Sequence, residues 1–322
     1  MKAFITGGTG FIGSHLIERL LVRNIEVFAL VRDPRNVKFL KGFDIHLLPG
    51  DLFSIPALPT DLDCVFHLAG LTKALKSADY YTVNQEGTAS LFDALRRQRL
   101  SPKIVYLSSL AAAGPSAGGQ ARQEGDPPNP VTPYGESKLR GENEALARRD
   151  CFSVAVLRVG GVFGPRDRDF LNFFKFVQRG LLPSFGFKPR RLSVCYVKDL
   201  IRALDTAAGA DLPSGEIFNI GDPVPYSFDE IGRAAGRVLG KTLRRIVVPL
   251  PIVYLAALGS GAAAKLARRP SIVNRQKFNE LKQEGWVADV RKAKERLFFR
   301  TRYSLEDGLQ ETLLWYKSNG WL

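Results

Sequence analysis

The chain begins with an apolar segment, Lys2-Ala-Phe-Ile-Thr6, that leads directly into Gly7-Gly-Thr-Gly10-Phe-Ile-Gly13. Glycines three residues apart after a short strand are typical of a strand-to-helix unit that holds a pyrophosphate at the helix N-terminus. Gly7 permits the tight turn, Gly10 lets backbone N–H groups approach phosphate oxygens, and Gly13 lets the helix lie close to the sheet. We therefore expect a strand over residues 2–6, a helix over about 11–23 and a dinucleotide between them.

Length and composition indicate a globular α/β protein with a sizeable core. The 322 residues suffice for one large domain or a domain with an appended lobe, because single cores seldom grow beyond ~250–300 residues. Hydrophobic residues make up 45% of the chain and charged residues 24%, which argues against a disordered or fibrous protein.

The net charge of +14 is unusual and is concentrated near the C-terminus. Residues 241–302 hold 15 Lys and Arg against four Asp and Glu. An anionic substrate, an acidic membrane surface or nucleic acid would explain this excess, and so would a solvated helical surface. We expect no nucleic-acid partner, because no recognition motif accompanies the charge.

The cysteines and histidines indicate neither a disulfide framework nor a metal site. Cys64, Cys151 and Cys195 are scattered and odd in number, so we expect buried, reduced thiols in a cytoplasmic protein. The three histidines lack the spacing of metal ligands. A strand that starts at residue 2 leaves no room for a signal or transit peptide, in agreement with a cytoplasmic location.

Strand-like and helix-length segments alternate, which predicts a Rossmann-type, doubly wound parallel sheet. The expected strands are 2–6, 26–31, 44–48, 63–68, 103–108, 153–159 and 216–220. Helices are expected to begin near Phe11, Tyr80, Thr132 and Asp199. The pattern changes after Gly164-Pro165. We predict a dinucleotide-binding domain over residues 1–164 plus 192–222 and a smaller, mainly helical substrate lobe over residues 165–191 plus 223–322.

Two further segments stand out. The loop Gly114–Pro133 is rich in Gly, Pro, Ser and Gln, which is typical of a mobile active-site flank and equally of a plain surface loop. The run Ile246–Ala264 carries no charge, and basic residues border it on both sides, Arg268 and Arg269 among them. Pro249 and Pro251 shorten its continuous helix. It could be a buried helix or pocket wall, an interfacial membrane contact or, least favoured, a membrane span.

Tyr134 and Lys138 lie four residues apart on an expected helix and project from the same face. An ammonium one turn away lowers the pKa of a phenol, which can then exchange a proton with an alcohol or alkoxide while a nicotinamide exchanges hydride. Ser109, at the end of the 103–108 strand, can hydrogen-bond to the same substrate oxygen. We expect these three side chains to form the catalytic set.

Further segments follow in a characteristic order: Thr6 to Gly13, Gly50-Asp51-Leu52, His67-Leu-Ala-Gly70, Val83-Asn-Gln-Glu-Gly-Thr88, Ser108-Ser109, Tyr134 with Lys138, Leu157-Arg158 to Gly164-Pro165, and Tyr196-Val-Lys-Asp199. Along essentially its whole length the chain resembles the extended short-chain dehydrogenase/reductases, the NAD(P)-dependent epimerase/dehydratase family.

The resemblance implies an enzyme with Ser109, Tyr134 and Lys138 in catalytic roles, and a homodimer. Asp51 and Leu52 should face the adenine, and Leu68-Ala69-Gly70 should pass beneath the cofactor. The expected cofactor-binding residues are Gly7, Gly10, Phe11, Ile12, Gly13, Arg32, Asp51, Leu52, Leu68, Ala69, Gly70, Asn84, Ser108, Tyr134 and Lys138.

The charge at the end of the second strand favours NADP over NAD. NAD enzymes usually place a carboxylate there for the ribose hydroxyls. In the NAD-dependent epimerases that acid falls where this chain has Val31, and Arg32 follows in a position suited to a 2′-phosphate. Asp33 is the counter-argument, because a small shift in register would bring it to the ribose. The run from Val31 to Asn36 also resembles the NADPH-using dihydroflavonol and cinnamoyl-CoA reductases.

Two departures weaken a nucleotide-sugar interpretation. The nucleotide-sugar epimerases commonly carry an Asn where this chain has Gly161, and an Arg where it has Leu192, with Arg190-Arg191 just before. Our first hypothesis is therefore an NADP(H)-dependent oxidoreductase acting on a secondary alcohol or ketone, with a small-molecule substrate that is hydrophobic or anionic. The second is a nucleotide-sugar epimerase or dehydratase that retains NAD. A cofactor-sensing regulatory protein is the third, and the intact Ser, Tyr and Lys argue against it.

Overall fold

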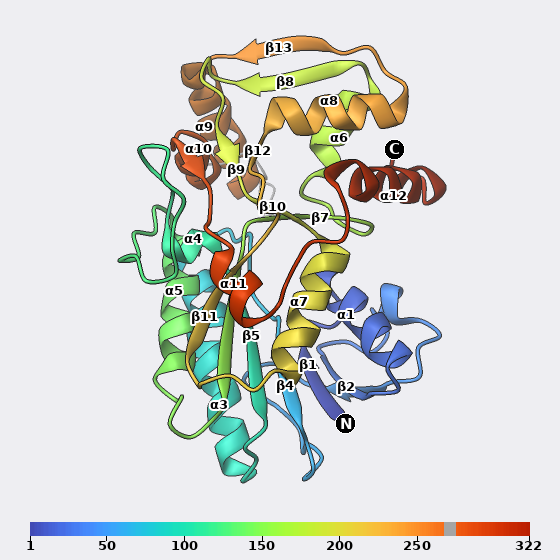
Figure 1. Ribbon diagram of the computed structural model, residues 1–322, viewed down its shortest axis with the longest axis vertical. Helices are drawn as coiled ribbons and strands as arrows, with labels where there is room; N and C mark the ends of the chain where they lie inside the picture. The colour runs from blue at the N-terminus through green and yellow to red at the C-terminus, as the bar shows by residue number, and fades with distance from the viewer. Residues whose placement is uncertain (267–274) are drawn as a thin grey trace.

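The computed structural model describes residues 1–266 and 275–322, and a seven-stranded parallel sheet forms its centre (Figure 1). In spatial order the strands are β11 (Glu216–Ile220), β6 (Val154–Val159), β5 (Lys103–Ser109), β4 (Cys64–His67), β1 (Lys2–Thr6), β2 (Glu26–Val31) and β3 (His46–Pro49). The chain starts at β1, winds outward to β3, and then builds β4 onward on the other side. Ligands of such sheets bind where the winding reverses, here beside β1 and β4.

The predicted fold class is confirmed. The expected strand 44–48 starts later, at His46, and the other strands lie within about a residue of their predicted bounds.

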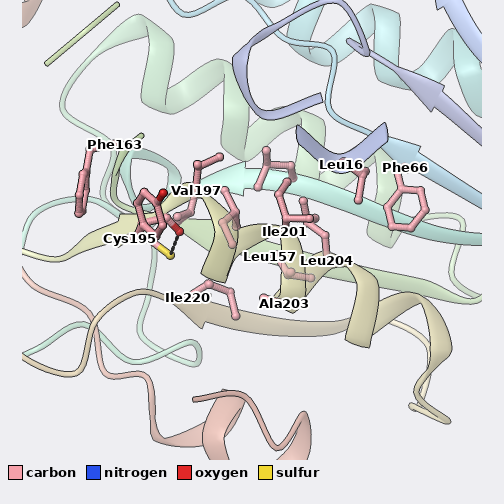
Figure 2. Close-up of a cluster of buried hydrophobic side chains, with 14 of the residues drawn as sticks. Leu16, Phe66, Leu157, Phe163, Cys195, Val197, Ile201, Ala203, Leu204 and Ile220 are labelled. Carbon is pink, nitrogen blue, oxygen red and sulfur yellow. Dashed lines mark hydrogen bonds between the residues drawn. The ribbon is translucent and has the colours of Figure 1, made fainter. Parts of the chain in front are cut away.

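Helices cover both faces of the sheet. On one face lie α1 (Phe11–Val22) and α7 (Val197–Gly209), and on the other α3 (Gly87–Arg97) and α5 (Pro133–Leu146) (Figure 1). Successive strand residues point to opposite faces. Ile5 therefore joins the cluster around Leu16 of α1, while Phe4 joins that around Leu91 of α3. Figure 2 shows the first cluster, with Leu157 of β6 next to Ile201 and Leu204 of α7.

The segment before α3 differs from the single helix expected from Tyr80. It consists of α2 (Ser77–Tyr81) and a π-helical turn over Thr82–Glu86, which leads directly into α3. A π-helical turn changes the direction in which side chains leave the helix and is frequent at functional sites. Here it carries Asn84, one of the expected cofactor residues.

The remaining described residues form a lobe with helices and three small sheets, in which β7 pairs with β10, β9 with β12 and β14, and β8 with β13. Its elements are β7 (Gly161–Phe163), α6 (Leu171–Gln178), β8 (Leu181–Phe185), β9 (Arg191–Leu192), β10 (Val194–Tyr196), β12 (Tyr226–Ser227), α8 (Phe228–Leu239), β13 (Arg244–Val248), α9 (Leu250–Leu266), α10 (Arg275–Leu281), β14 (Gly285–Trp286), α11 (Arg291–Arg296) and α12 (Leu305–Ser318). The strands were not predicted, because segments of two to five residues are too short for a reliable period-two pattern.

One hydrophobic cluster continues from the main sheet into the lobe. It includes Leu16 of α1, Phe174 of α6 and Tyr316 of α12. The lobe therefore packs on the sheet through a shared core. The division into residues 1–164 plus 192–222 and the remainder stays a prediction.

The uncharged run Ile246–Ala264 divides between β13 and α9. Pro251 stands in the first turn of α9, where a helix can accept proline because its N–H groups have no partner within the helix. Val253 and Ala257 are buried, so the run is partly a core helix. Among the helices of the described residues, none is long and apolar enough to cross a bilayer. Arg268 and Arg269 lie outside the described residues.

Two of the three cysteines are buried as predicted. Burial raises the pKa of the Cys64 thiol to about 12 and raises that of Cys195 as well. Cys151 is exposed, and the prediction was wrong there, because this residue lies in the turn between α5 and β6.

Candidate functional site

The glycine turn between β1 and α1 has the geometry that the sequence predicts. Gly7 adopts a φ of +76°, and a Cβ there would lie 2.7 Å from the Ala69 nitrogen. A Cβ on Gly13 would lie 2.3 Å from the Gly7 carbonyl oxygen. Gly10 is the N-cap of α1 and provides no side chain to cap the helix, so the N–H groups of the first turn are available to an anion.

The end of β4 lies against this turn. The Ala69 N–H donates to Thr6 Oγ1 at 3.2 Å, and the Leu68 N–H donates to the Thr6 carbonyl oxygen at 3.2 Å. A Cβ on Gly70 would lie 3.2 Å from Asn84 Oδ1 and 3.8 Å from Lys138 Nζ. The fold therefore brings together the expected residues of the glycine turn, the β4 end and α5.

Asn84 is buried, and its side chain is fully engaged within the protein. Its Oδ1 accepts the Leu71 N–H at 2.7 Å, and its Nδ2 donates to the Leu71 carbonyl oxygen at 3.1 Å and to Ser137 Oγ at 2.9 Å. Asn84 thus fixes the loop after β4 to α5. Its contact with a cofactor stays a prediction.

A buried hydrogen-bonded chain that the sequence analysis missed supports the same corner. His67 Nδ1 lies 2.7 Å from Thr6 Oγ1, and His67 Nε2 lies 3.0 Å from Thr88 Oγ1. Burial, together with the nearby charge of Lys138, lowers the pKa of His67 to about 3. The imidazole is therefore neutral near pH 7 and links β1, β4 and α3.

Tyr134 lies in the first turn of α5. Thr132 caps this helix by accepting the Gly135 N–H at 3.1 Å, and Pro133 occupies the first helical position. Burial raises the pKa of the Tyr134 phenol to about 12, although a hydrogen bond with Ser109 lowers it. The Ser109 and Tyr134 hydroxyls are therefore within hydrogen-bond reach of each other. A shared bond to a substrate oxygen stays a prediction. The predicted lowering of the Tyr134 pKa is wrong for this structure.

Lys138 explains that difference. Its Nζ donates to the Leu107 carbonyl oxygen at 2.8 Å and lies 4.3 Å from the centre of the Tyr106 ring. The ammonium is thus directed toward the end of β5, and the charges that act on Tyr134 are those of Glu280 and Asp169, which raise its pKa. Burial lowers the pKa of Lys138 itself to about 8.

Ser108 bonds to a buried ion pair. Its hydroxyl donates to Glu142, whose Oε2 also accepts Arg158 NH2 at 2.6 Å. Glu142 and Arg158 are almost completely buried. The sequence held two signals for this pair: Glu142 lies one turn after Lys138 on α5, and Arg158 interrupts an apolar strand, where a charge requires a partner.

The adenosine end of the predicted cofactor site contains Asp51, Leu52 and Arg32. Asp51 Oδ1 accepts the N–H groups of Phe53 at 2.8 Å and Ser54 at 3.0 Å, so it shapes the turn after β3. Leu52 is buried against α3, where a Cβ on Gly87 would lie 2.6 Å from Leu52 Cδ1. Asp51 is exposed at the edge of the sheet, as a contact with adenine would require.

Arg32 and Asp33 differ in their partners. Arg35 donates to the Asp33 carboxylate from its Nε at 2.9 Å and from its backbone N–H at 3.0 Å, and lowers the pKa of Asp33. Arg32 is exposed, and no hydrogen bond or ion pair joins it to any residue within 1–266 or 275–322.

Charged groups of the lobe act on Tyr134, which the sequence did not reveal. The charges of Glu280 on α10 and of Asp169 act on the phenol. Lys73, in the loop after β4, forms an ion pair with Asp169. Asp167 is buried, which raises its pKa to about 7. The loop 114–133 is attached to the lobe as well, since Ser116 and Arg122 bond to the backbone of Gly285 and Val287.

Comparison with known proteins gives consistent matches. The model of the NAD dependent epimerase/dehydratase family matches residues 3–221. A protein named ceramide reductase from Caulobacter vibrioides is 27% identical over 99% of this chain and 95% of its own length. An uncharacterized UDP-glucose epimerase from Bacillus subtilis is 27% identical over 99% of this chain and 98% of its own. The UDP-glucuronic acid 4-epimerase of Bacillus cereus in complex with NAD has a TM-score of 0.78 at 24% identity, covering 99% of both chains.

Proposed function

Because the chain belongs to the NAD-dependent epimerase/dehydratase family, we propose that it is an NADP(H)-dependent reductase that interconverts a ketone and a secondary alcohol on a lipophilic substrate. Members of the family are enzymes, and so is this protein. A cytoplasmic location and a homodimer also remain predictions.

The proposed chemistry follows from the protonation of Tyr134. When bound, the nicotinamide cofactor supplies the hydride. With a pKa of about 12, the phenol is protonated at neutral pH and can donate its proton to the carbonyl oxygen of a ketone. Ser109, which hydrogen-bonds with Tyr134, would bond to the same oxygen, and Lys138, whose Nζ donates to the Leu107 carbonyl oxygen, would help to hold the cofactor. The products are the secondary alcohol and the oxidised cofactor.

One observation carries the choice of a reductase over a sugar-nucleotide enzyme: Leu192 stands where those enzymes carry an arginine, and the two arginines before it hydrogen-bond to protein acceptors. Arg190 donates to the carbonyl oxygens of Phe185 at 2.8 Å and Gln283 at 3.0 Å. Arg191 donates to the Pro225 carbonyl oxygen at 2.8 Å and to Glu230. A diphosphate would therefore compete with protein acceptors for both guanidinium groups.

The surroundings of Gly161 agree with this proposal. A Cβ at Gly161 would lie 3.2 Å from Phe170 Cζ and 3.6 Å from Val194 Cγ1. An Asn at this position would therefore meet apolar carbon atoms. The name of the Caulobacter relative, ceramide reductase, states an activity on a lipid and supports a lipophilic substrate here.

The state of Arg32 supports NADP. Asp33, the carboxylate that would suit the ribose of NAD, is bound to Arg35, and Arg32 is left for a 2′-phosphate. The solved relative from Bacillus cereus holds NAD, so the preference requires a direct test.

The test compares retained and added cofactor. Mass analysis of the small molecules released by denaturing the purified protein identifies any retained nucleotide. NADPH oxidation is then followed with long-chain ketones and, separately, with UDP-sugars as epimerisation substrates. We expect little retained NAD and oxidation of NADPH that depends on the ketone. Stoichiometric retained NAD together with epimerisation of a UDP-sugar would replace the reductase by the epimerase.

A further inference from the structure

Helix α9 presents a row of large apolar side chains to solvent. Ile252 is 55%, Leu255 66% and Leu258 44% exposed, although Val253 and Ala257 on the other side of the helix are buried. Single exposed apolar residues are ordinary on protein surfaces, whereas a contiguous row along one helix marks an interaction surface.

Further exposed apolar side chains lie on the strand that precedes α9 and on the loop after its partner strand β8. Arg245 of β13 reaches toward α8, where its Nε lies 2.8 Å from Asp229, so the next residue, Ile246, points to the outer side of the strand. The loop after β8 carries Phe187, which is 79% exposed, and touches the start of α9 through Gly186 and Leu250. We call Phe187, Ile246, Ile252, Leu255 and Leu258 the apolar face.

Exposed basic side chains lie next to two residues of the apolar face. Lys188 follows Phe187, Arg244 precedes Ile246 by two residues, and both are exposed. On the other side of β13, toward α8, a hollow is lined by Arg233, Arg237, Lys241 and Arg245, and Arg245 pairs there with Asp229. Within the described part of the chain, no carboxylate pairs with Lys188, Lys241 or Arg244. From Ile246 to Ser260 the sequence has no acidic residue.

We propose that the apolar face docks the protein onto an anionic lipid bilayer, with α9 lying in the interface. An apolar helix face and a basic border are the two signals that together give stable attachment to anionic lipid. Strands β8 and β13 and helix α9 lie at the end of the lobe away from the main sheet, and α10 lies below α9, closer to the sheet (Figure 1).

The same elements connect the proposed bilayer contact to the catalytic site. The rings of Tyr254 on α9 and Phe278 on α10 lie 5.0 Å apart. Two residues beyond Phe278, Glu280 acts on Tyr134. This step rests on the proposed function: a lipophilic ketone dissolved in the bilayer would reach Tyr134 alongside α10.

Vesicle sedimentation tests the docking. The full chain is mixed with vesicles of phosphatidylcholine alone or with phosphatidylglycerol added, at low and high salt. We expect binding to the anionic vesicles that weakens at high salt. Removing apolar area with I252S and L255S together should lower the partition coefficient about tenfold or more. K188Q and R244Q should each lower it about fivefold, and only on anionic vesicles.

Matched controls change the same kinds of side chain elsewhere. L314S removes an exposed leucine from α12, and R97Q removes an exposed arginine from α3. Neither should change vesicle binding. Equal binding of the I252S/L255S variant and the unaltered protein overturns the proposal. The proposal also fails if the I252S/L255S variant differs from the unaltered protein in oligomeric state but binds vesicles equally well. The apolar face would then contact a second copy of the chain.

NADPH oxidation with a short, water-soluble ketone separates the two proposals. If the unaltered protein reduces this ketone yet fails to bind anionic vesicles at low salt, docking is wrong and the reductase proposal stands. If the protein binds vesicles as expected but none of the ketones supports NADPH oxidation, docking stands and the reductase proposal fails.

Discussion

Burial favours the neutral forms of both Tyr134 and Lys138. It raises the pKa of the phenol to about 12 and lowers that of the ammonium to about 8. The phenol therefore carries its proton throughout the physiological pH range, which suits donation to a ketone better than removal of a proton from an alcohol. The ammonium remains charged near pH 7 and is held by the Leu107 carbonyl oxygen and the Tyr106 ring.

The first prediction concerns proton transfer by Tyr134. Y134F should lower turnover by a factor of ~10² to 10⁴, the range for loss of a positioned acid or base. Cofactor affinity, measured by calorimetry, should change little. Y81F makes the same chemical change on α2, where the hydroxyl bonds to Glu136, and should leave turnover nearly normal. Near-normal turnover of Y134F would contradict the role given to this residue.

The second prediction concerns the stability cost of Lys138. Its pKa in the folded protein, about 8, is below the ordinary 10.5, so between these values the unfolded chain binds more protons and stability rises with pH. Below pH 8 the buried charge opposes folding by ~3 kcal/mol. K138M removes this cost but also loses the hydrogen bond to the Leu107 carbonyl oxygen. The net gain in the free energy of unfolding at pH 7 should be ~1–3 kcal/mol, and turnover should be abolished.

Urea unfolding as a function of pH measures this effect. The gain from K138M should shrink between pH 8 and 10.5, because the unaltered lysine loses its charge over that window. K175M, at an exposed site on α6, should change stability by less than about 0.5 kcal/mol. A loss of stability in K138M at pH 7 would show that its bonds outweigh the cost of its burial.

At the scale of elements, a buried ionic chain joins β5, α5 and β6. The Ser108 hydroxyl, the Glu142 carboxylate and the Arg158 guanidinium bond in sequence, and Arg158 Nε lies 3.0 Å from Glu142 Oε1. These elements carry Ser109, Tyr134 and Lys138. The ion pair therefore fixes the strand end and the helix that bring the proposed catalytic groups together.

The third prediction follows from this pair. E142Q leaves the charge of Arg158 buried without an anionic partner and should cost ~3 kcal/mol or more in the free energy of unfolding, measured in urea. E144Q removes a partly exposed partner of Arg148 on the same helix and should cost ~0–1 kcal/mol. A similar loss in the free energy of unfolding for E142Q and E144Q would contradict the special contribution assigned to the buried Glu142–Arg158 pair.

The sequence predicted those elements whose local residue pattern agrees with the place that they take in the fold. Gly7 and Gly13 occupy positions where a Cβ would collide with neighbouring backbone, so their spacing carried the fold and one end of the cofactor site. The placement of Ser109 and Tyr134 was predictable because the signals for the end of the strand and the start of the helix were both clear. The ranges of β8 and β13 were missed, since short strands in the lobe carry no extended alternation.

What the sequence could not supply are contacts made across long separations. Burial sets the direction of the Tyr134 pKa shift, and the charge of Glu280 adds to it. Nothing in residues 275–281 indicates that Glu280 of α10 would act on Tyr134. A spacing of four residues placed Tyr134 and Lys138 on one helix face. It did not reveal that the Leu107 carbonyl oxygen would hold the ammonium.

At the scale of the whole molecule, the proposed cofactor site lies on the main sheet, while the charges of Glu280 and Asp169 that act on Tyr134 belong to the lobe. The Lys73–Asp169 ion pair and the shared hydrophobic core hold the two parts together. A dinucleotide that binds the folded state and not the unfolded state therefore stabilises both parts of the chain against unfolding. The free energy of global unfolding then reports which cofactor binds more tightly.

The fourth prediction uses that linkage. NADPH at about 100 times its Kd should raise the free energy of unfolding by about 2.7 kcal/mol. NADH at the same concentration should raise it by less, because only NADPH offers Arg32 a phosphate. R32A should reduce the effect of NADPH to that of NADH, and added salt should do so in part. R35A releases the Asp33 carboxylate and should strengthen the effect of NADH. Greater stabilisation of the unaltered protein by NADH than by NADPH would reject the preference for NADP and assign the ribose contact to Asp33.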